Sequence, residues 1–517
     1  MRPLSRRTAL FWFACLMTAA PARATITYLG AGTIPANTTD DTGLLGNLED
    51  GSPGNLAGGM GSAIAYSGVG DLYYMVTDRG PGDGSTTWLT RMYKVQVAIT
   101  PSGPGFTVTP TLGHATLFNN EAGAYFVGNS SAFDSTNSPA SLRLDPEGLR
   151  VSQSGTTVFV SDEFGPFVYE FDLGSARRLR SITVPPTFLI ANPSATTNAE
   201  LPPNNTSGRQ ANRSMEGLAI SPDGSTLYGL VQSPLLQDGA LSGANNRIGT
   251  NCRLLEMDLS SGVTREFLYQ LSSASIGATE VLAINDHEFL VLERDGRGLN
   301  SNNTAQFKKI FRIDIAAATD ISGVVNLPTT GTPVGVTPVS KLLFLDILVA
   351  TGIPGSQFPE KLEGITFGPD LADGRHVLVV SADNDFKNSI DNWFFAFAFD
   401  PLDLPGYVPQ NIAPVVDAAS LTTRTADHAL AMPAPHPVRG ATRFDYALSR
   451  DGHVKVAIYD ARGRRVRRLL DRVQKAGAGS LSWDCRDDAG HDLPKGTYFA
   501  RLQAHGTNRV LKIILLE

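Results

Sequence analysis

Short apolar runs separated by turn residues make up most of the chain. Between residues 25 and 405 the runs are rich in Val, Ile, Phe, Tyr and Thr, and Gly, Asp, Asn, Pro and Ser separate them. This pattern is typical of β-strands joined by turns. Residues 157–160 and 167–171 predict one hairpin, and residues 218–220 and 226–230 predict another around the Asp-Gly turn at 223–224. We therefore predict an all-β domain over residues 25–405.

Five stretches of this domain repeat one arrangement of polar residues. Each has a polar residue at the mouth of a strand, a turn, a second strand and a further polar or acidic group, and the repeats begin at Ser62, Glu147, Glu216, Glu280 and Glu363. Recurrence at a period of tens of residues indicates a repeat architecture. A β-sandwich gives no reason for acids to recur in register with the repeats, so we predict a β-propeller of five to seven blades. Residues 25–29 are predicted to close the ring by pairing with residues 394–399.

The recurring acids are the main candidates for chemistry. If the repeats surround an axis, equivalent positions converge, and two carboxylates about 6 Å apart repel by roughly 3 kcal/mol at an effective dielectric near 20. Such a ring needs protons, arginines or a cation. Hard cations such as calcium prefer oxygen ligands. The predicted cation ligands are Glu147, Glu216, Glu280 and Glu363.

A second β-unit is predicted after a linker. Residues 406–432 are rich in Pro, Ala, Thr and Asp without periodicity, which is typical of a linker. In residues 433–517 apolar and polar positions alternate over several short runs between Gly-rich turns. This spacing predicts a small Ig-like β-sandwich. The arginine-rich segment 462–468 is either a solvated hairpin or a contact to an anionic surface, and the sequence favours the hairpin.

Residues 1–24 predict a signal peptide. Arginines at positions 2, 6 and 7 precede an apolar run over residues 9–17, and residues 22–24 form an Ala-x-Ala cleavage pattern. The apolar run is too short to span a bilayer, and no later segment is long and apolar enough to do so. The arginine pair partly resembles a twin-arginine signal, so the export route stays open. We expect a protein that is secreted, at the cell surface or in the periplasm.

Composition excludes several classes of function. The net charge of -7 gives no electrostatic footprint for nucleic acid. There is no Gly-x-Ser-x-Gly elbow, no Gly-Lys-Ser/Thr phosphate loop and no zinc-type spacing of histidines. Cleavage before Thr25 would leave only Cys252 and Cys485, which lie in different predicted domains and could form one interdomain disulfide.

An ordered set of motifs runs through the first domain. Its members are residues 145–149 (DPEGL), 161–166 (SDEFGP), 212–218 (NRSMEGL), 232–234 (QSP), 290–295 (LVLERD), 361–365 (KLEGI) and 383–386 (DNDF). This set resembles the bacterial phytase-like family, often described as having esterase-like activity. The resemblance implies a propeller fold and hydrolysis of phosphoric esters. Ser62 replaces the first glutamate and Glu280 lacks the following glycine, so the acid ring is not fully symmetric.

The tail carries a second set of motifs, at residues 456–463 (VAIYDARG), 483–484 (WD), 496–499 (GTYF) and 515–516 (LL). They resemble the Ig-like module of flagellar hook-capping proteins and the sorting domains at the C-termini of many secreted bacterial proteins. The resemblance implies contact with the secretion machinery or the cell surface. Cys485 stands where such modules usually have glycine.

With a phosphorylated or other small ester as the expected substrate, acids from the second strands and arginines beside them are the predicted catalytic residues. Carboxylates there could move protons, and arginines could receive phosphate oxygens. The predicted set is Asp162, Glu163, Arg213, Glu293, Arg294, Asp383 and Asp385. The sequence thus predicts an exported, metal-dependent phosphoric-ester hydrolase, with calcium as the expected cation. The alternative is a non-catalytic propeller that binds a ligand or a surface through a structural network of acids and arginines.

Overall fold

The computed structural model describes residues 26–133, 141–299, 301, 303–413, 429–430, 438, 440, 442–448, 450–475, 477–504 and 507–516. It divides into two compact units, one of residues up to Ile412 apart from 154–156, and one of residues from Ala413 onward. The predicted signal peptide and most of the predicted linker lie outside the described residues.

Five four-stranded antiparallel sheets make up the described part of the first unit. The first sheet contains β2 (Ala63–Tyr66), β3 (Leu72–Val76), β4 (Arg91–Ser102) and β5 (Gly105–Leu117). The second contains β6 (Pro146–Val151), β7 (Thr157–Asp162), β8 (Phe167–Asp172) and β9 (Arg178–Ile182). The third contains β10 (Met215–Ile220), β11 (Thr226–Val231), β14 (Asn251–Asp258) and β15 (Thr264–Gln270). The fourth contains β16 (Gly277–Ala283), β17 (Glu288–Arg294), β18 (Lys308–Asp314) and β19 (Ser340–Asp346). The fifth contains β20 (Lys361–Phe367), β21 (His376–Asp383), β22 (Asn392–Phe399) and β1 (Thr27–Ile34).

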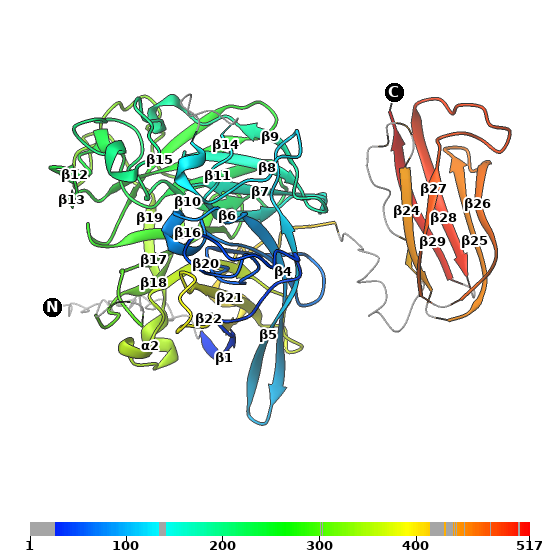
Figure 1. Cartoon of the computed structure of the whole chain (residues 1–517), viewed down its shortest axis with the longest axis horizontal. Helices are drawn as coiled ribbons and strands as arrows, with labels where there is room; N and C mark the ends of the chain where they lie inside the picture. The colour runs from blue at the N-terminus through cyan, green and yellow to red at the C-terminus, as the bar shows by residue number, and fades with distance from the viewer. Residues whose placement is uncertain are drawn as a thin grey trace, which may run out of the picture. The chain divides into compact units, whose positions relative to one another are not determined.

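The first strands of these sheets form a closed ring. Each of β2, β6, β10, β16 and β20 contacts the next in this order, and β20 contacts β2 again. In Figure 1 the labels of β6, β10, β16 and β20 lie near the middle of the domain, with β5 and β9 farther out. The unit is therefore a five-bladed β-propeller, which confirms the predicted fold class and settles the blade count within the predicted range.

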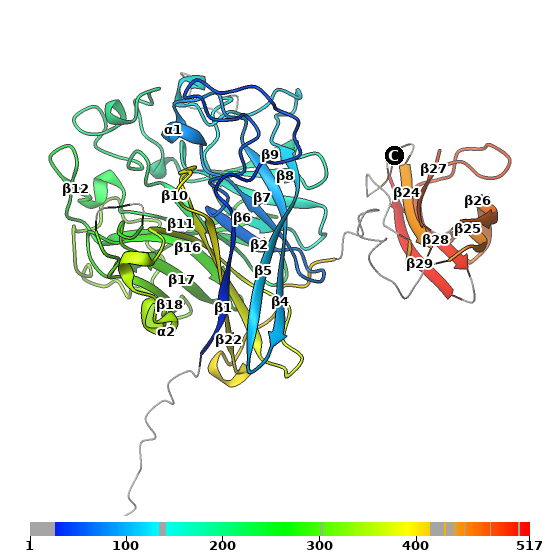
Figure 2. The same cartoon turned by 60° about the horizontal axis from the view of Figure 1, so that its bottom comes forward.

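The N-terminal strand closes the ring. Strand β1 pairs with β22 from Thr27 opposite Ala398 to Ile34 opposite Asn392, and Figure 2 shows the two strands side by side. This confirms the predicted pairing and extends it to residue 34. Because β22 has neighbours on both faces, its phenylalanines alternate between two cores: Phe395 and Phe397 face one apolar cluster, and Phe394 faces another.

Short elements connect the blades. The two-stranded hairpin of β12 (Leu241–Ser242) and β13 (Asn246–Arg247) is inserted between β11 and β14. The helices α1 (Pro81–Gly84) and α2 (Ile347–Thr351) are each about one turn long. Single 3₁₀ turns occupy Ser130–Ala132, Pro186–Phe188, Thr197–Glu200, Leu236–Asp238, Gly355–Gln357 and Pro401–Asp403. Both predicted hairpins are confirmed, as β7 with β8 and β10 with β11.

Part of the predicted linker belongs to the propeller. The amide nitrogen of Val408 donates to the carbonyl of Ile284, and the side chain of Gln410 donates to the carbonyl of Val151 at 2.7 Å. Ile412 packs into the core beside the first two blades. The chain therefore remains attached to the propeller up to this residue.

The second unit contains two antiparallel sheets around one core. One sheet is made of β23 (Ala429–Leu430), β24 (Thr442–Leu448) and β27 (Gly477–Trp483). The other is made of β26 (Arg465–Gln474), β25 (Gly452–Asp460), β28 (Gly496–Ala504) and β29 (Thr507–Leu515). Phe444, Ile458 and Trp483 are among the buried side chains of the shared core. This confirms the predicted Ig-like sandwich, which also includes residues 429 and 430 of the predicted linker.

Two smaller predictions concern this unit. The arginines of segment 462–468 lie on the β25–β26 hairpin, and Arg464, Arg465 and Arg467 form ion pairs with Asp460, Asp488 and Asp484. This arrangement fits a solvated hairpin. Cys252 and Cys485 are both free, so they do not form the interdomain disulfide that the sequence allowed.

Candidate functional site

Three of the recurring glutamates stand at bulges in the inner strands. In β10 the pairing passes from Met215 directly to Gly217, which leaves Glu216 as an extra residue. In β20 it passes from Leu362 to Gly364 and leaves out Glu363, and in β6 Glu147 and Gly148 lie in the same kind of interruption. A bulge redirects the extra side chain away from the regular face of the strand. All three glutamates therefore line one mouth of the propeller.

The glycine after each glutamate is required by the next blade. A Cβ atom on Gly148 would lie 2.6 Å from the Cβ of Leu218, and one on Gly217 would lie 2.8 Å from the nitrogen of Val281. A Cβ on Gly364 would lie 2.9 Å from the nitrogen of Ile64. These separations are too short for nonbonded atoms, so the Glu-Gly pair combines a redirected acid with a close approach of neighbouring blades.

In the fourth blade, the residue equivalent to the glutamates of the other blades lies one position before the one that the sequence predicts. In β16 the pairing passes from Ala278 to Glu280 and leaves out Thr279, so Thr279 stands where the other blades have glutamate. Thr279 lines the mouth, whereas Glu280 takes the position of the glycine. The sequence comparison missed this shift because it matched acid to acid and not bulge to bulge.

Glu280 instead serves as the counter-ion of a buried arginine. Its carboxylate lies 3.0 Å from the guanidinium of Arg150 and accepts hydrogen bonds from the amides of Leu218 and Val281. The same guanidinium donates to the carbonyl of Val281 and to that of Ile64 in the first blade. Burial raises the pKa of Glu280 to about 8, against the lowering effect of Arg150. Glu280 therefore has a protein partner for its charge, and the cation ligands proposed below do not include it.

The mouth is a cavity of about 210 Å³. Of the predicted site residues, it brings together Glu147, Glu163, Glu216, Glu363, Arg213 and Arg294. This volume is below the range of roughly 300–1,000 Å³ that is usual for pockets of drug-sized ligands. The cavity is therefore suited to a small polar group.

One acidic group at the mouth consists of Asp145, Glu147 and Glu163. One oxygen of each lies within 4.8 Å of the others, and all three residues are buried. Among the described residues, neither carboxylate oxygen of Asp145 has a hydrogen-bond partner, although Arg79 approaches to 3.4 Å. Glu163 accepts one hydrogen bond, from the amide of Ser214. Like charges are thus concentrated here with incomplete compensation.

Burial raises the pKa values of three acids at or beside the mouth, Asp145, Glu147 and Glu216. Burial and then the charges of Glu216 and Asp145 raise the pKa of Glu147 well above its usual range. Burial raises the pKa of Asp145 to about 7, with Arg79 opposing the shift and Glu163 adding to it. Burial and the charge of Glu163 also raise the pKa of Glu216, one oxygen of which has no hydrogen-bond partner among the described residues. These carboxyl groups therefore either keep their protons or, when ionised, need a nearby cation.

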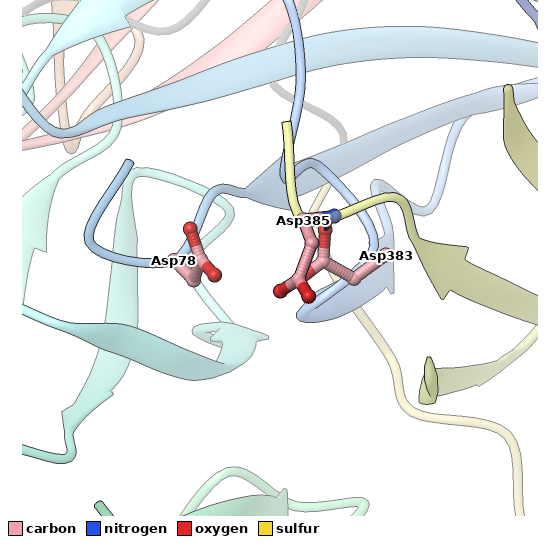
Figure 3. Close-up of side chains that lie close together, drawn as sticks. All are labelled: Asp78, Asp383 and Asp385. Carbon is pink, nitrogen blue, oxygen red and sulfur yellow. Dashed lines mark hydrogen bonds between the residues drawn. The ribbon is translucent and has the colours of Figure 1, made fainter. Parts of the chain in front are cut away.

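A second acidic group consists of Asp78, Asp383 and Asp385, which converge in Figure 3 from the first and fifth blades. This group already has a cation, because the ammonium of Lys361 forms ion pairs with all three carboxylates, at 3.8 Å from Asp78 and 3.5 Å from Asp383. Although burial opposes it, Lys361 lowers the pKa of Asp385 to about 2.

Four of the predicted catalytic residues lie away from the mouth lining: Asp383 and Asp385 belong to the second acidic group, and Asp162 and Glu293 have other roles. Asp162 accepts hydrogen bonds from the amides of Asp145 and Phe164, so it holds the turn that presents the acids. Glu293 accepts a hydrogen bond from the hydroxyl of Tyr269 at 2.8 Å and pairs with Lys341. Both carboxylates have protein partners that account for their burial.

Arginines line the part of the mouth formed by the third and fourth blades. Arg294 pairs with Glu363, and Arg213 donates to the side-chain oxygen of Gln232 at 3.2 Å. Arg247 lines the same cavity, and sequence reasoning missed it. It lies on β13, in an insertion outside the repeats, so no repeated pattern marks it. Lys361 was also missed, although its place two residues before Glu363 in the KLEGI motif could have marked it.

Comparison with known proteins supports this view of the first unit. The family model described as "Esterase-like activity of phytase" matches residues 55–386. The chain belongs to the phytase-like family. The model of the FlgD Ig-like domain matches residues 439–508, which confirms the second resemblance.

Individual relatives are more distant. An "Uncharacterized secreted protein" of Arthroderma benhamiae is 28% identical over 355 residues, which cover 54% of this chain and 64% of that protein. The solved structure of FlgD from P. aeruginosa is 30% identical over 14% of this chain and 57% of that chain, with a TM-score of 0.12. PorZ, a surface component of the type-IX secretion system of Porphyromonas gingivalis, is 12% identical over 89% of this chain and 60% of that chain, with a TM-score of 0.30. These TM-scores are too low to support an argument.

The described residues contain no helix long and apolar enough to cross a membrane.

Proposed function

We propose that this phytase-like protein is an exported, calcium-dependent hydrolase of phosphoric esters that acts at the acidic mouth of its propeller. The observation that carries the proposal is one small cavity lined both by buried acids, among them Glu216 with one oxygen lacking a hydrogen-bond partner, and by Arg213 and Arg247, which have no carboxylate partner among the described residues. Membership of the phytase-like family supports ester hydrolysis as the reaction class.

The residues present fit a hard cation. Asp145, Glu147 and Glu163 offer three carboxylate oxygens close together, and the oxygens of Asp145 are buried without hydrogen-bond partners among the described residues. Arg79 supplies one positive charge, at 3.4 Å from Asp145, against three buried carboxylates, so these carboxylates, when ionised, keep a net negative charge. Burial of that charge is unfavourable, and oxygen-only ligand sets suit calcium. We assign the cation to this group. The group of Asp78, Asp383 and Asp385 is a weaker candidate, because Lys361 already supplies its positive charge.

The side chains at the mouth would bind the cation, bind the phosphate group and accept a proton. Bound calcium would neutralise the carboxylates and polarise a phosphoryl oxygen. Arg213 and Arg294 would bind other oxygens of the phosphate group through charge-assisted hydrogen bonds. Glu216 would accept the proton of the attacking water, since it lines the mouth outside the assigned cation group and one of its oxygens has no hydrogen-bond partner among the described residues.

The test is the rate of hydrolysis of p-nitrophenyl phosphate and of bis-p-nitrophenyl phosphate by the purified protein. We expect turnover that a chelator abolishes and that added calcium restores. Glu147→Gln should lower the rate by at least about 100-fold, because it removes one ligand charge without a change in size. Glu256→Gln is the matched control, since Glu256 pairs with Arg265 on the outer strands of the third blade. Hydrolysis that is indifferent to the chelator and to Glu147→Gln would refute the proposal.

A second candidate function is a non-catalytic propeller that binds a ligand or a surface. It is favoured by the protein partners that several mouth acids already have, such as Arg294 with Glu363 and Lys361 with Asp385. In that case no ester is hydrolysed, and the mouth substitutions alter stability or ligand binding alone.

The second unit suggests where the enzyme works. Its match to the FlgD Ig-like domain and the secreted relative support export, and we propose that this unit contacts the cell surface or the secretion machinery. Removal of residues from Ala413 onward should abolish retention at the cell surface and leave hydrolysis unchanged. Surface fractionation of cells that express each form measures the difference.

A further inference from the structure

The β12–β13 hairpin brings a third arginine to the mouth. Its two strands pair Leu241 with Arg247 and Ser242 with Asn246. At its base, the amides of Ile248 and Gly249 donate to the carbonyl of Ala240 at 3.0 and 3.1 Å. These hydrogen bonds hold the base of the hairpin directly after Arg247. The backbone position of Arg247 is therefore fixed.

The side chain of Arg247 is partly buried and has no hydrogen bond or ion pair with any described residue. Other buried arginines of the propeller do have carboxylate partners: Arg91 pairs with Asp40, Arg209 with Glu200, and Arg253 with Asp238. Removing a guanidinium from water without an anion is unfavourable. Arg247 thus lacks the compensation that this fold gives its other buried arginines.

The neighbours of Arg247 add to the imbalance. Burial and the positive charges of Arg213 and Arg294 lower the pKa of Arg247 to about 10. Arg294 has Glu363 as its counter-ion, whereas the side chain of Arg213 donates to the neutral Gln232. Two guanidinium groups therefore face one small cavity without a carboxylate in contact. A tetrahedral oxyanion has several oxygens that can accept hydrogen bonds from both.

We propose that Arg247 is a further substrate-binding residue, which with Arg213 holds the phosphate group of the substrate in the cavity that the carboxylates also line. This inference rests on the proposed function, because it assigns the anionic group to the same mouth. The inference also assigns a role to the β12–β13 hairpin. This insertion in the third blade adds one substrate-binding side chain to a site that the repeated strands form.

The test separates this inference from hydrolysis by measuring the binding of inorganic phosphate. Isothermal titration of the purified protein with phosphate, with calcium present, gives the dissociation constant without any need for turnover. We expect Arg247→Gln to weaken phosphate binding roughly 10- to 100-fold, as expected for the loss of a charge-assisted contact. Arg247→Lys should weaken it less. Arg265→Gln, in the same blade and away from the mouth, is the matched control and should leave binding unchanged.

Two further measurements sharpen the result. The melting temperature of the Arg247→Gln protein should be no lower than that of the parent, because the substitution breaks no contact with the described residues and removes an unpaired charge. The effects of Arg213→Gln and Arg247→Gln should be less than additive if both residues hold one anion. Phosphate binding that Arg247→Gln leaves unchanged, or the absence of phosphate binding by the parent protein, would overturn the inference. Phosphate binding that depends on Arg247 in a protein without turnover would support it and count against the proposed hydrolase.

Discussion

Single side chains at the mouth show how one fold treats similar acids differently. Asp145 and Asp78 are both buried, and burial raises the pKa of each to about 7. Asp78 accepts a hydrogen bond from the amide of Gly80 and has Lys361 nearby, whereas the carboxylate oxygens of Asp145 accept no hydrogen bond from the described residues. The same residue type is thus a compensated acid in one group and a candidate ligand in the other.

The raised pKa values predict a pH dependence for the metal-free protein. The folded-state pKa of about 7 for Asp78 and Asp145 exceeds the value of roughly 3.9 for an unfolded chain. The folded protein therefore binds more protons than the unfolded chain between about pH 4 and pH 7, so its free energy of unfolding should fall as pH rises through this window. We expect a loss on the order of 3 kcal/mol between about pH 5 and pH 8 in urea titrations.

Calcium should reverse that trend, because it favours the ionised carboxylates. The matched measurement is the same urea series at saturating calcium. Metal-free protein that becomes more stable from about pH 5 to pH 8 would contradict the assignment of uncompensated buried acids.

Lys361 provides a second test at this scale. Lys361→Met leaves Asp78, Asp383 and Asp385 without their shared cation, so metal-free protein should lose about 3–5 kcal/mol of stability at neutral pH. Calcium should restore much of this loss, because the three freed carboxylates form an oxygen ligand set. Thermal melts with and without calcium measure both effects.

Lys387→Met is the control for that substitution, since Lys387 is more exposed and pairs only with Asp385 among the described residues. A Lys361→Met protein that is as stable as its parent and insensitive to calcium would show that the ammonium does not compensate this group.

At the scale of elements, the bulged inner strand is the unit that builds the site. It presents Glu147, Glu216 and Glu363 to the mouth and lets the following glycine approach the next blade. The two functions lie in adjacent residues, so a shift of one residue exchanges them. Strand β16 differs from the other inner strands by this one-residue shift, and its acid, Glu280, forms a buried ion pair with Arg150.

The close approach at Gly217 gives a prediction for the element. Gly217→Ala would place a Cβ 2.8 Å from the nitrogen of Val281 and 2.9 Å from the carbonyl carbon of Glu280. Because both are backbone atoms, the blades must separate, and we expect a loss of about 1–3 kcal/mol. Gly323→Ala, where a Cβ would have nothing within 4 Å, should change stability little. Equal denaturation midpoints for the two variants would refute the packing argument.

At the scale of the whole molecule, ring closure depends on one strand from the N-terminal end. Strand β1 completes the fifth blade, and it also lies against the first, where a Cβ on Gly32 would lie 2.2 Å from the carbonyl oxygen of Val108. The closing strand therefore joins the last blade to the first through both hydrogen bonds and side-by-side packing.

Truncation tests this closure. Deletion of residues 1–24, the predicted signal peptide, should leave the cooperative unfolding transition of the propeller unchanged, because β1 is intact. Deletion of residues 1–34 removes β1, exposes the edge of β22 and should give protein that aggregates or unfolds without cooperativity. Calorimetry and size-exclusion chromatography of the two forms make the comparison. A cooperative, monomeric 35–517 chain would show that β1 is dispensable.

Much of this architecture could be predicted from the chain alone. Alternation of apolar and turn residues marks strands locally, and recurrence of the Glu-Gly pair marks blades, because each blade must solve the same packing problem. Residues 145–149, 212–218 and 361–365 thus indicated both the propeller and three of the mouth acids. The pairing of residues 25–29 with residues 394–399 was also predicted, and strand β1 makes it.

Only the tertiary structure decided which acids act together. Glu280 and Thr279 differ by one position along the chain, and the bulge in β16 alone determines which of them reaches the mouth. Arg247 reaches the mouth from an insertion that carries no local signature of a site, and the KLEGI motif marks the position of Lys361 but not its three carboxylate partners. The physical reason is that charge compensation depends on distances across blades, whereas sequence patterns record only the periodicity within each blade.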